Sequence, residues 1–546
     1  MNTVTIKPVV RVKSGDATGA SARMMSAFGG PAYSAADTRM QGLMNWAPNL
    51  NSADADWLPD RDLAVSRTRD LERNEGAVSS GVDRQVDMLV GGTFRLNSKP
   101  SARLLGISQS EADELGQSIQ TEWQAYAEDP IFRCDAERQL NFVGLMGLMA
   151  REFVAGGEAF GVLRWLEKPG RDYATAMHVI DTDRLCNPNG TMDTATLRGG
   201  VETDEDGAPI AYHVRKAHPS DVFSYGAESW IWQRFERWDE VGDWQRPKVI
   251  HCYDKRRPGQ SRGVSRLVTA LSRMKMLASY SKAELNTAAL NASIVGAIYT
   301  QLGADYAAET LGGANFGQGT DWKGFNQSRS EFYQGGNSMD QARFLTLFPT
   351  DRLDLNSQPR QTSGFASFQQ SFLRSLAASL GVSYEQLSMD WSQTNYSSAR
   401  AALNEVWRGI HRLRGLLVSG IANLWFAAWL EEALDRGKVD VPAGAKSFYE
   451  APAGYLRGDW IGPARGYIDP VKEAQAAIMR MGARMTTLER ETAEQGGDWE
   501  VNIEQLAREA EHLARNNLTP VAAASVPAKP GLDDEETTQQ SEEGRS

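Results

Sequence analysis

The sequence predicts an α+β fold in which a β-rich section lies between two helical sections. Apolar residues recur at three- and four-residue spacing before residue 155 and again after residue 264, which is typical of amphipathic helices. Between residues 156 and 253, short alternating or apolar runs are separated by turn residues, which indicates strands. The 50 glycines point to many turns and argue against an all-helical bundle.

Composition excludes several classes of protein. With 546 residues, 41% hydrophobic and 23% charged, the chain is long enough for a large core divided over several packing units. Neither a C-x-x-C nor an H-E-x-x-H pair occurs, so we expect no metal site and no cofactor. The glycine-rich stretch at 312–324, GGANFGQGTDWKG, lacks the Lys-Ser/Thr ending of an ATP-binding loop. The cysteines lie far apart, at Cys134, Cys186 and Cys252.

The helical first part follows a weakly patterned arm. Residues 1–59 are rich in Gly, Ala, Ser and Asn, and we expect them to be mobile or peripheral. Helices are then predicted over 60–90, 110–127 and 139–154. Strands follow to about residue 253, with Asp206-Gly207 supplying a turn. The first helix after the strands is predicted over 264–292, on the apolar spacing from Val264 to Leu277.

The second half is predicted to be mostly helical. Residues 295–355 form a mixed segment in which SIVGAIYT and ARFLTLFP resemble strands. A helix over 363–380 is followed by Gly381 as a C-terminal cap, and Ser383 with Gln386 matches a capping box. A long helix starts at Ser398, and bends or close neighbours are expected at its three glycines, Gly409, Gly415 and Gly420. Further helices are predicted over 470–485 and 501–516, and the acidic tail 519–546 is expected to be disordered.

The longest uncharged apolar run is Leu416–Leu430, which is shorter than the roughly 20 residues that span a bilayer. We therefore interpret it as a buried helix and expect no membrane partner. The net charge is −12. A protein that holds duplex DNA tightly usually presents a basic surface. This chain either does not touch nucleic acid or touches it without holding it.

One short motif suggests chemistry. Gly259-Gln260-Ser261-Arg262-Gly263 matches the G-x-S-x-G pattern of serine hydrolases, with Ser261 as nucleophile. A nucleophile turn needs a strand directly before it, small neighbours and a helix directly after it. Here Lys255 to Pro258 intervene, and Arg262 stands where the oxyanion would bind. A basic turn between a sheet and a helix is the preferred interpretation, and a serine hydrolase remains the alternative.

A third hypothesis is a nucleic-acid adaptor that uses the arginines of this turn. Arg256, Arg257 and Arg262 would contact the phosphate backbone. Three arginines on a background of −12 make a weak anchor for duplex DNA.

Several stretches of the sequence are informative when they are read in order. They are RTRDLERNEGAVSSGVDRQVDMLVGG (67–92), GGEAFGVLRW (156–165), VIDTDRLCNP (179–188), GVETDEDGAPIAYHVRKAHP (200–219), RPGQSRGVSRL (257–267), ASLGVSYEQLSMDWSQTNYSSARAAL (378–403) and GPARGYIDPVKEA (462–474). Together they resemble the lambda-type portal proteins of tailed bacteriophages. The resemblance covers roughly residues 60–510 and rests on the combination of segments.

The resemblance implies the phage portal fold, assembled as a ring of typically twelve subunits around a channel for double-stranded DNA, with no enzymatic activity of its own. It implies a mixed wing, a helical stem, an α/β clip and a helical crown. Carried onto this chain, the parts are an arm (1–59), wing (60–262), stem helix (263–294), clip (295–357), second stem helix (358–386), tunnel loop (387–398), long tunnel helix and wing return (399–469), crown (470–518) and acidic tail (519–546).

The same resemblance implies a site and partners. The tunnel loop would face DNA through Asp390, Trp391, Gln393, Thr394, Asn395 and Tyr396. The loop has no Lys or Arg between Leu387 and Ser398, which suits passage without grip. Implied partners are further copies of the chain, the terminase large subunit, head-completion and adaptor proteins, and the major capsid and scaffolding proteins. The implied location is the portal vertex of the virion, after assembly in the host cytoplasm.

Overall fold

The structure is a computed structural model. It describes residues 45–293, 363–392, 394–466 and 469–518, with the short segments 297–298 and 345–346 and the single helical positions 327 and 331. The predicted disorder of the acidic tail, and most of the predicted mobile arm and clip, therefore lie outside the described residues. Of the two strands predicted in the clip, short pieces are described: β11 (Ala297–Ile298) pairs in parallel with β12 (Leu345–Thr346).

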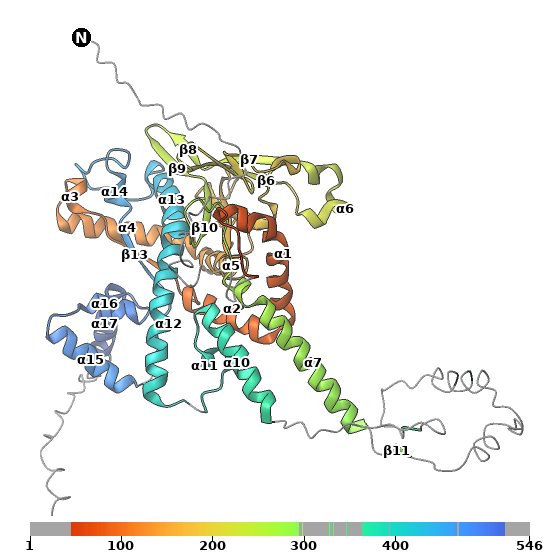
Figure 1. Cartoon of the computed structure of the whole chain (residues 1–546). Coiled ribbons are helices and arrows are strands. Elements are labelled where there is room, and N and C mark those ends of the chain that lie inside the picture. Colours follow the sequence, from red (N-terminus) through yellow and green to blue (C-terminus); the bar gives the residue numbers. More distant parts are fainter. Residues whose placement is uncertain are drawn as a thin grey trace, which may run out of the picture.

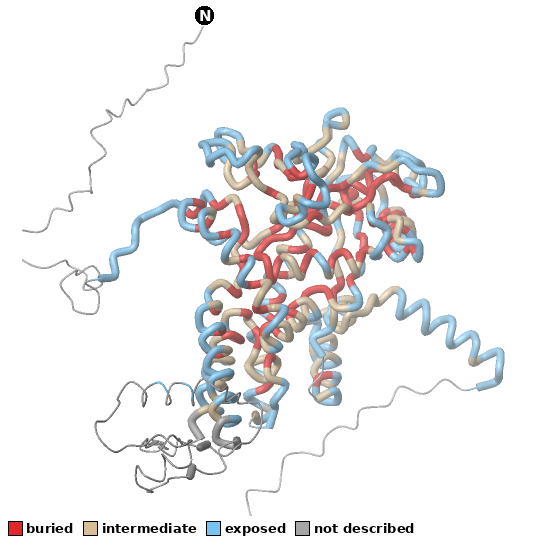
Figure 2. The backbone as a smooth tube through the Cα atoms, turned by 90° about the vertical axis from the view of Figure 1, so that its right-hand side faces the viewer, coloured by how far each residue is buried: buried red, intermediate tan, exposed pale blue. Residues whose placement is uncertain are grey.

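The described chain consists of a mixed body from which several helices project (Figure 1). Sheets and short helices fill the body, and α7, α10 and α12 descend from it side by side. Buried residues concentrate in the body, whereas the projecting helices are largely exposed (Figure 2). This α+β arrangement confirms the predicted fold class.

The N-terminal helices begin earlier than the sequence predicts. Ser52 caps α1 by accepting a hydrogen bond from the Ala55 N–H at 3.2 Å, and Asp54 and Trp57 are buried. The first helix therefore begins before residue 59, the predicted end of the arm, because burial of these two side chains fixes the segment to the body. The predicted single helix 60–90 is two helices, with extended backbone at Glu75 between them. The bounds are α1 (Ala53–Asn74) and α2 (Gly76–Leu89).

The next helices match the prediction and frame an aromatic core. A capping box between Ser108 and Glu111 starts α4 (Gln109–Ala127), and Asn141 caps α5 (Phe142–Ala155). Trp123 lies at the centre of the core, where its ring meets neighbouring rings edge-on at centroid distances of 5.0–5.7 Å. The partners of this ring are Phe142, Phe426, Trp429 and Trp460. Rings at these distances in edge-on geometry stabilise a core beyond the area they bury.

The β-rich section forms separate small sheets. A three-stranded antiparallel sheet has the order β10-β2-β3, and a four-stranded sheet has the order β4-β5-β6-β7. Nearly every residue of β2 is buried, as expected for a central strand. The bounds are β2 (Glu158–Trp165), β3 (Thr175–Val179), β4 (Leu197–Arg198), β5 (Val201–Thr203), β6 (Pro209–Arg215), β7 (Trp232–Glu236), β8 (Trp238–Val241), β9 (Trp244–Pro247) and β10 (Val249–Tyr253). A short helix α6 (Val222–Tyr225) interrupts the strands.

The helix after the sheets starts later than predicted. Residues Arg266–Thr269 form a 3₁₀ turn, and α7 runs over Leu271–Ser293. The predicted helix 363–380 is confirmed as α10 (Ser363–Leu380), with Gly381 at φ 71° after it, and the capping box of Ser383 and Gln386 starts α11 (Tyr384–Ser388). The long helix α12 (Tyr396–Leu417) begins at Tyr396 rather than at Ser398, because Asn395 caps it.

A π-helical turn joins α12 to the next helix. Val418–Ala422 form this turn and α13 (Asn423–Asp435) follows directly. Of the three glycines at which bends or close neighbours were predicted, only Gly420 has such a neighbour: a Cβ there would lie 2.8 Å from Cys252 Sγ, while Gly409 and Gly415 face open space. The helical stretch Ser397–Asp435 is long and apolar enough to span a bilayer, but 56% of its most apolar window is buried inside the protein. The predicted buried helix is confirmed by Ile421 and Trp425, which are fully buried.

The C-terminal part first adds a strand to the body and then continues into further helices. β13 (Gly458–Ile461) pairs antiparallel with β1 (Arg95–Ser98), which ties the two halves of the sequence together. The helix predicted over 470–485 is α15 (Pro470–Gly482), and that predicted over 501–516 is α17 (Trp499–Arg515). Three short helices are not predicted by the sequence pattern: α3 (Ala102–Leu105), α14 (Pro452–Tyr455) and α16 (Leu488–Glu494).

Candidate functional site

The loop between α11 and α12 is the first candidate site. Met389 adopts a left-handed conformation at φ 56°, and the chain then turns through Asp390 and Trp391 before α12 begins. Asp390 Oδ1 accepts a hydrogen bond from the Ser392 N–H at 3.0 Å. Hydrogen bonds from Ser392, from its side chain first and then from its backbone, lower the pKa of Asp390. Asp390 is therefore ionised at neutral pH and gives the loop its negative charge.

The other predicted loop residues divide into local roles and exposed surface. Thr394 Oγ1 donates to Glu385 Oε1 at 3.3 Å, and Asn395 Oδ1 accepts the Ser398 N–H at 2.8 Å as the cap of α12. The Trp391 side chain is 41% exposed, and the carbonyl oxygen of Trp391 accepts a hydrogen bond from the Thr394 N–H at 3.2 Å. Gln393 lies outside the described residues, as does the side chain of Tyr396. The structure thus brings Asp390 and Trp391 to the surface, and contact with DNA stays a prediction for all six residues.

Ser261 is held by a carboxylate. Its Oγ–H donates to Asp54 Oδ2 at 2.6 Å, and its N–H donates to Asp54 Oδ1 at 2.9 Å. The imidazole of His251 does not serve it, because His251 Nε2 lies 3.0 Å from Glu158 Oε2. A serine nucleophile needs a neighbouring base that takes its proton. The bonds of Ser261 instead tie the turn to the first turn of α1, and among the described residues no imidazole is hydrogen-bonded to Ser261, so the structure does not support the serine hydrolase.

The glycines of the motif have a steric explanation. A Cβ on Gly263 would lie 2.2 Å from Gly157 O, and one on Gly157 would lie 2.3 Å from the Ser265 N. The turn therefore packs backbone against backbone on the start of β2, which only glycine permits. Gly259 has φ 75°, in the region that favours glycine. The G-x-S-x-G pattern reflects this close approach.

Arg262 is buried in an ion-pair network that the sequence pattern did not predict. Its side chain is 1% exposed and contacts Glu158, whose side chain is 0% exposed, through a bond of 2.6 Å from Nη2. Nη1 donates to Leu185 O at 2.6 Å and to Gly199 O at 2.7 Å. These bonds exclude Arg262 from the hypothesis of a nucleic-acid adaptor. Arg257 is also engaged, because its Nη1 donates to Asp56 Oδ2 at 2.7 Å.

Glu158 is the centre of this network. It accepts hydrogen bonds from Arg61 of α1, from His251 of β10 and from the Gly263 N–H of the turn. Burial alone would raise the pKa of Glu158, but the charges of Arg262 and Arg61 outweigh burial and hold the pKa well below its usual value. Burial lowers the pKa of His251, so its ring is neutral near pH 7. The network therefore joins α1, β2, β10 and the turn before α7 through one buried carboxylate.

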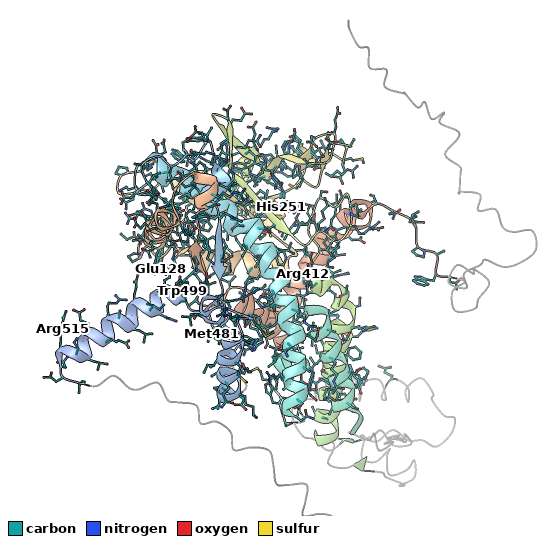
Figure 3. The ribbon with its side chains drawn as sticks, turned by 90° about the vertical axis from the view of Figure 1, so that its left-hand side faces the viewer. Glu128, His251, Arg412, Met481, Trp499 and Arg515 are labelled. Atoms are coloured by element: carbon teal, nitrogen blue, oxygen red, sulfur yellow. The ribbon has the colours of Figure 1, made fainter. Side chains whose placement is uncertain are left out.

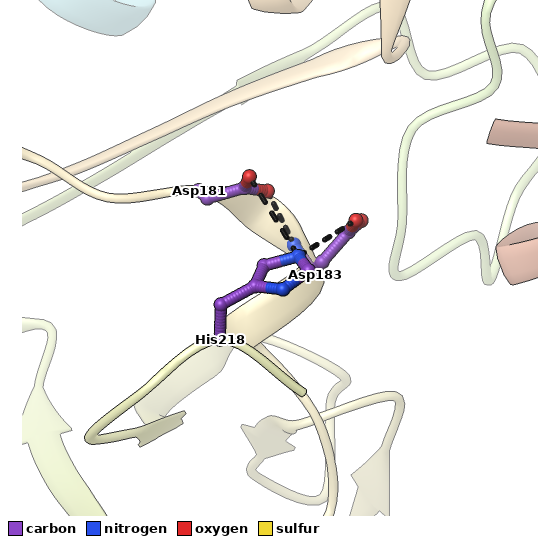
Figure 4. Close-up of side chains that lie close together, drawn as sticks. All are labelled: Asp181, Asp183 and His218. Carbon is purple, nitrogen blue, oxygen red and sulfur yellow. Dashed lines mark hydrogen bonds and ion pairs between the residues drawn. The ribbon is translucent and has the colours of Figure 1, made fainter. Parts of the chain in front are cut away.

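A second cluster lies beside it at Asp181, Asp183 and His218 (Figure 4). His218 Nε2 is 3.4 Å from Asp183 Oδ2 and 4.0 Å from Asp181 Oδ2. These residue types can hold a metal ion, but Arg69 already donates to Asp183 at 2.5 Å and to Asp181 at 3.0 Å. A guanidinium between the two carboxylates neutralises them and repels a cation. We interpret the cluster as an ion-pair network that anchors α1.

The family of the chain follows from comparison with known proteins. The chain matches the family described as phage portal protein, lambda family, over residues 39–414. It is 34% identical over 497 residues to the portal protein of Escherichia phage N15, covering 90% of this chain and 92% of that protein. This chain belongs to the lambda family of phage portal proteins. This assignment confirms the resemblance read from the sequence segments.

Two further relatives of this chain are also named as portal proteins. The portal protein is 33% identical over 499 residues to portal protein B of Escherichia phage lambda, covering 90% of this chain and 91% of that protein. It is 24% identical over 446 residues to a probable portal protein of Halomonas phage phiHAP-1, covering 79% and 77% of the two chains. Among solved structures, it is similar to the neck of an empty gene transfer agent particle, with a TM-score of 0.40 and 13% identity over 80% of this chain and 93% of that chain. The family is structural, and portal proteins are components of phage particles.

Proposed function

We propose that this portal protein assembles into a ring of identical subunits, twelve as its family resemblance implies, at one vertex of the capsid. Double-stranded DNA crosses the centre of the ring during packaging and ejection, and the subunit performs no catalysis and needs no cofactor. The observation that carries the proposal is the loop before α12. It exposes Asp390 and Trp391 and holds no Lys or Arg between Leu387 and Ser398.

Charge supports this role of the loop. Proteins hold duplex DNA mainly by replacing its counterions with Lys and Arg. A channel through which DNA slides needs the opposite property at its narrow part. The ionised Asp390 beside the exposed Trp391 repels the phosphate backbone and offers a steric contact in place of an ionic one.

Exposed helix surface supports assembly. Past Leu277, no residue of α7 whose side chain is described is fully buried, and Met276 and Leu285 are 66% and 70% exposed. Its contact with α10 includes an aromatic pair, with the Tyr280 ring 4.9 Å from that of Phe368, and a hydrogen bond from Arg273 to Ser375 Oγ at 2.8 Å. A helix that projects with apolar residues on its surface gains stability from a neighbour. A ring supplies such a neighbour to every subunit through a repeated head-to-tail contact.

We assign the parts of the portal as the sequence segments imply. Residues 60–262, extended by the earlier start of α1, form the wing; 263–294 and 358–386 form the stem; and 387–398 form the tunnel loop. Residues 399–469 form the long tunnel helix and wing return, and 470–518 form the crown. The clip, residues 295–357, is the proposed dock for the terminase large subunit and for head-completion proteins, and the wing meets the major capsid and scaffolding proteins. Assembly takes place in the host cytoplasm and the product is part of the virion.

Electron microscopy of the purified protein tests the ring. We expect rotationally symmetric particles with a central hole wide enough for duplex DNA. Stable monomers under every condition that permits assembly would contradict the proposal.

Deletion of residues 305–340 tests the dock: rings should still form while binding of the terminase large subunit is lost.

A charge reversal tests the loop. Rings of Asp390→Arg should retain duplex DNA in a gel-shift assay at low salt, and retention should fall as salt rises. The matched control is Asp440→Arg, which makes the same change at an exposed residue outside the loop. Equal retention by the two variants would remove the loop from the channel.

A further inference from the structure

The helix α17 has a surface that the described part of its own chain does not cover. Every residue from Val501 to Ala510 is exposed, and none of its residues is fully buried. The helix runs outward from Trp499 at the body to Arg515 at its far end, away from the helix that carries Met481 (Figure 3). Isolated helices of this length are marginal in water, so α17 needs a partner surface.

The sequence of α17 specifies which side meets that partner. Along one side of α17, apolar residues recur at alternating spacings of four and three, which is the repeat of a helix that packs along another helix. We name this set the α17 stripe; it consists of Trp499, Ile503, Leu506, Ala510 and Leu513. Ile503 and Leu506 at its middle are 45% and 63% exposed. On the opposite side, Arg508 and Glu504 face solvent.

A second uncovered stripe lies on α15. Val471 and Ile478 share one side of the helix with Ala474, and they are 66% and 54% exposed. Met485, at 75% exposure, follows just after the helix ends. We name these four residues the α15 stripe. The inner side of α15 is used within the chain, because Arg480 bonds Glu491 of α16 at 2.7 Å and Glu473 is buried.

We propose that the α17 stripe of one subunit packs on the α15 stripe of the next subunit in the ring. The inference rests on the proposed ring and names the contact that closes its C-terminal end. Two different surfaces of one chain that fit each other form a head-to-tail contact, which repeats around a closed ring. The helices have comparable lengths, 17 and 13 residues, so the stripes can run along each other.

Charge favours this pairing. With histidine neutral, α17 carries a formal charge of −2 and residues 470–485 carry +2. The charged residues are Glu500, Glu504, Glu509, Glu511, Arg508 and Arg515 in α17, and Lys472, Arg480, Arg484 and Glu473 in the other segment. Opposite charge at an interface steers association and disfavours pairing of like surfaces. Two copies of α17 would repel each other. Within residues 470–485, Lys472 pairs with Asp469 and Arg480 with Glu491, so the attraction for α17 comes chiefly from Arg484.

The same charge argues against the tail of the chain as the occupant. Residues 519–546 follow α17 and contain six acidic residues between Asp533 and Glu543 with few large apolar residues. Such a segment has little to bury on the α17 stripe and is repelled by its net charge. A second copy offers both an apolar stripe and a complementary charge.

Cross-linking of the full-length protein tests the contact. The double variant Ile478→Cys with Leu506→Cys, treated with a short bismaleimide, should give a ladder of covalent oligomers, because each subunit carries both halves of the contact. Both substitutions lie at the middle of their stripes, so they stay close whichever way the helices run. An equimolar mixture of the two single variants should stop at covalent dimers.

Each other result has a definite meaning. The natural chain with its own three cysteines is the background control. Dimers from Leu506→Cys alone would show that α17 pairs with α17, and a cross-link within one chain would show that the helices meet inside the subunit. Either result overturns the contact. Rings seen by electron microscopy without any cross-link would overturn the contact and leave the proposed function standing, whereas absence of rings would overturn both.

A charge substitution gives an independent readout. Leu506→Glu should reduce the ring fraction at least tenfold at fixed protein concentration, measured by analytical ultracentrifugation. The control Gln505→Glu adds the same charge on a neighbouring residue off the α17 stripe and should leave the ring fraction unchanged. An unchanged thermal midpoint of the dissociated subunit shows that folding is intact. Equal effects of the two variants would contradict the contact.

Discussion

The body and the projecting helices of this portal protein solve the problem of stability in different ways. In the body, the carboxylate of Glu158 and its arginine partners are fully enclosed, and aromatic rings surround Trp123. On α7, α15 and α17, large apolar side chains such as Leu285, Ile478 and Leu506 are more than half exposed. The body is complete within one chain. The helices carry surfaces that only a neighbour can bury, which is what a subunit of an assembly requires.

The largest effect should follow from breaking the buried network of the body. Arg262→Ala leaves Glu158 buried without its main partner and should lower the free energy of unfolding by about 3–5 kcal/mol. Arg257→Ala, which removes the exposed pair with Asp56, should cost about 1 kcal/mol or less. Urea unfolding of the dissociated subunit measures both. Similar losses for the two variants would show that burial does not set the difference.

Two glycines of the continuous helical stretch, Gly420 and Gly415, allow the packed body to be compared with the exposed surface of the helix. Gly420→Ala places a Cβ 2.8 Å from Cys252 Sγ and should destabilise the subunit by about 1–3 kcal/mol through overpacking. Gly415→Ala meets open space in α12 and should stabilise it by up to about 1 kcal/mol through helix propensity. Opposite shifts of the thermal midpoint are the expected result. A gain of stability from both substitutions would contradict the close contact of Gly420 with β10.

Acid should weaken the body. Burial lowers the pKa of His251 in the folded state, so below its usual pKa of about 6.5 the unfolded chain binds a proton that the folded chain does not. Stability is therefore present above pH 6.5 and is lost as pH falls, by at most about 1.4 kcal/mol per pH unit for this group. His178 and His411, whose pKa values burial also lowers, act in the same direction. The lowered pKa of Glu158 adds a further loss below about pH 4.5.

The control for this dependence is His251→Gln, which retains a donor to Glu158 without a titrating ring. The slope of unfolding free energy between pH 7 and 5 should become shallower in this variant. An unchanged slope would assign the whole dependence to the other histidines.

The smallest effect is expected at the loop before α12. Trp391→Ala should change the unfolding free energy of the subunit by no more than about 0.5 kcal/mol, because the side chain is 41% exposed. The matched change in the body, Trp425→Ala, removes a fully buried ring and should cost several times more. Chemical denaturation distinguishes them. A large cost at Trp391 would mean that this residue supports the fold rather than the channel.

The sequence predicted those elements that local signals define. The helix 363–380 with Gly381 behind it, and the capping box at Ser383, rest on spacing and caps that act within a few residues. The start of α1 was missed because Asp54 and Trp57 are buried by contacts with distant parts of the chain. Short α16 was missed because its few residues give too little periodicity to detect.

The site shows the same limit. The sequence located the exposed loop, but it took Arg262 as an obstacle to a nucleophile. In the structure, Arg262 instead pairs with Glu158, which is 104 residues away in the sequence. The available signal in the sequence was Glu158 at the start of the apolar run EAFGVL, because an acidic side chain is buried in a strand only when it has a partner. The identity of that partner depends on tertiary contacts that spacing does not reveal.

The π-helical turn at Val418–Ala422 has a geometric consequence for the whole subunit. A π turn accommodates one extra residue, and one residue corresponds to about 100° of rotation about a helix axis. The π turn therefore changes which side of the continuous helix faces the body between α12 and α13. The helix is partly polar along α12, whereas its tryptophans are enclosed along α13. Excision of a single residue here would rotate Trp425 away from Phe142 and Trp429 away from Trp123. The orientation of α12 relative to the body is therefore set by one residue's worth of winding.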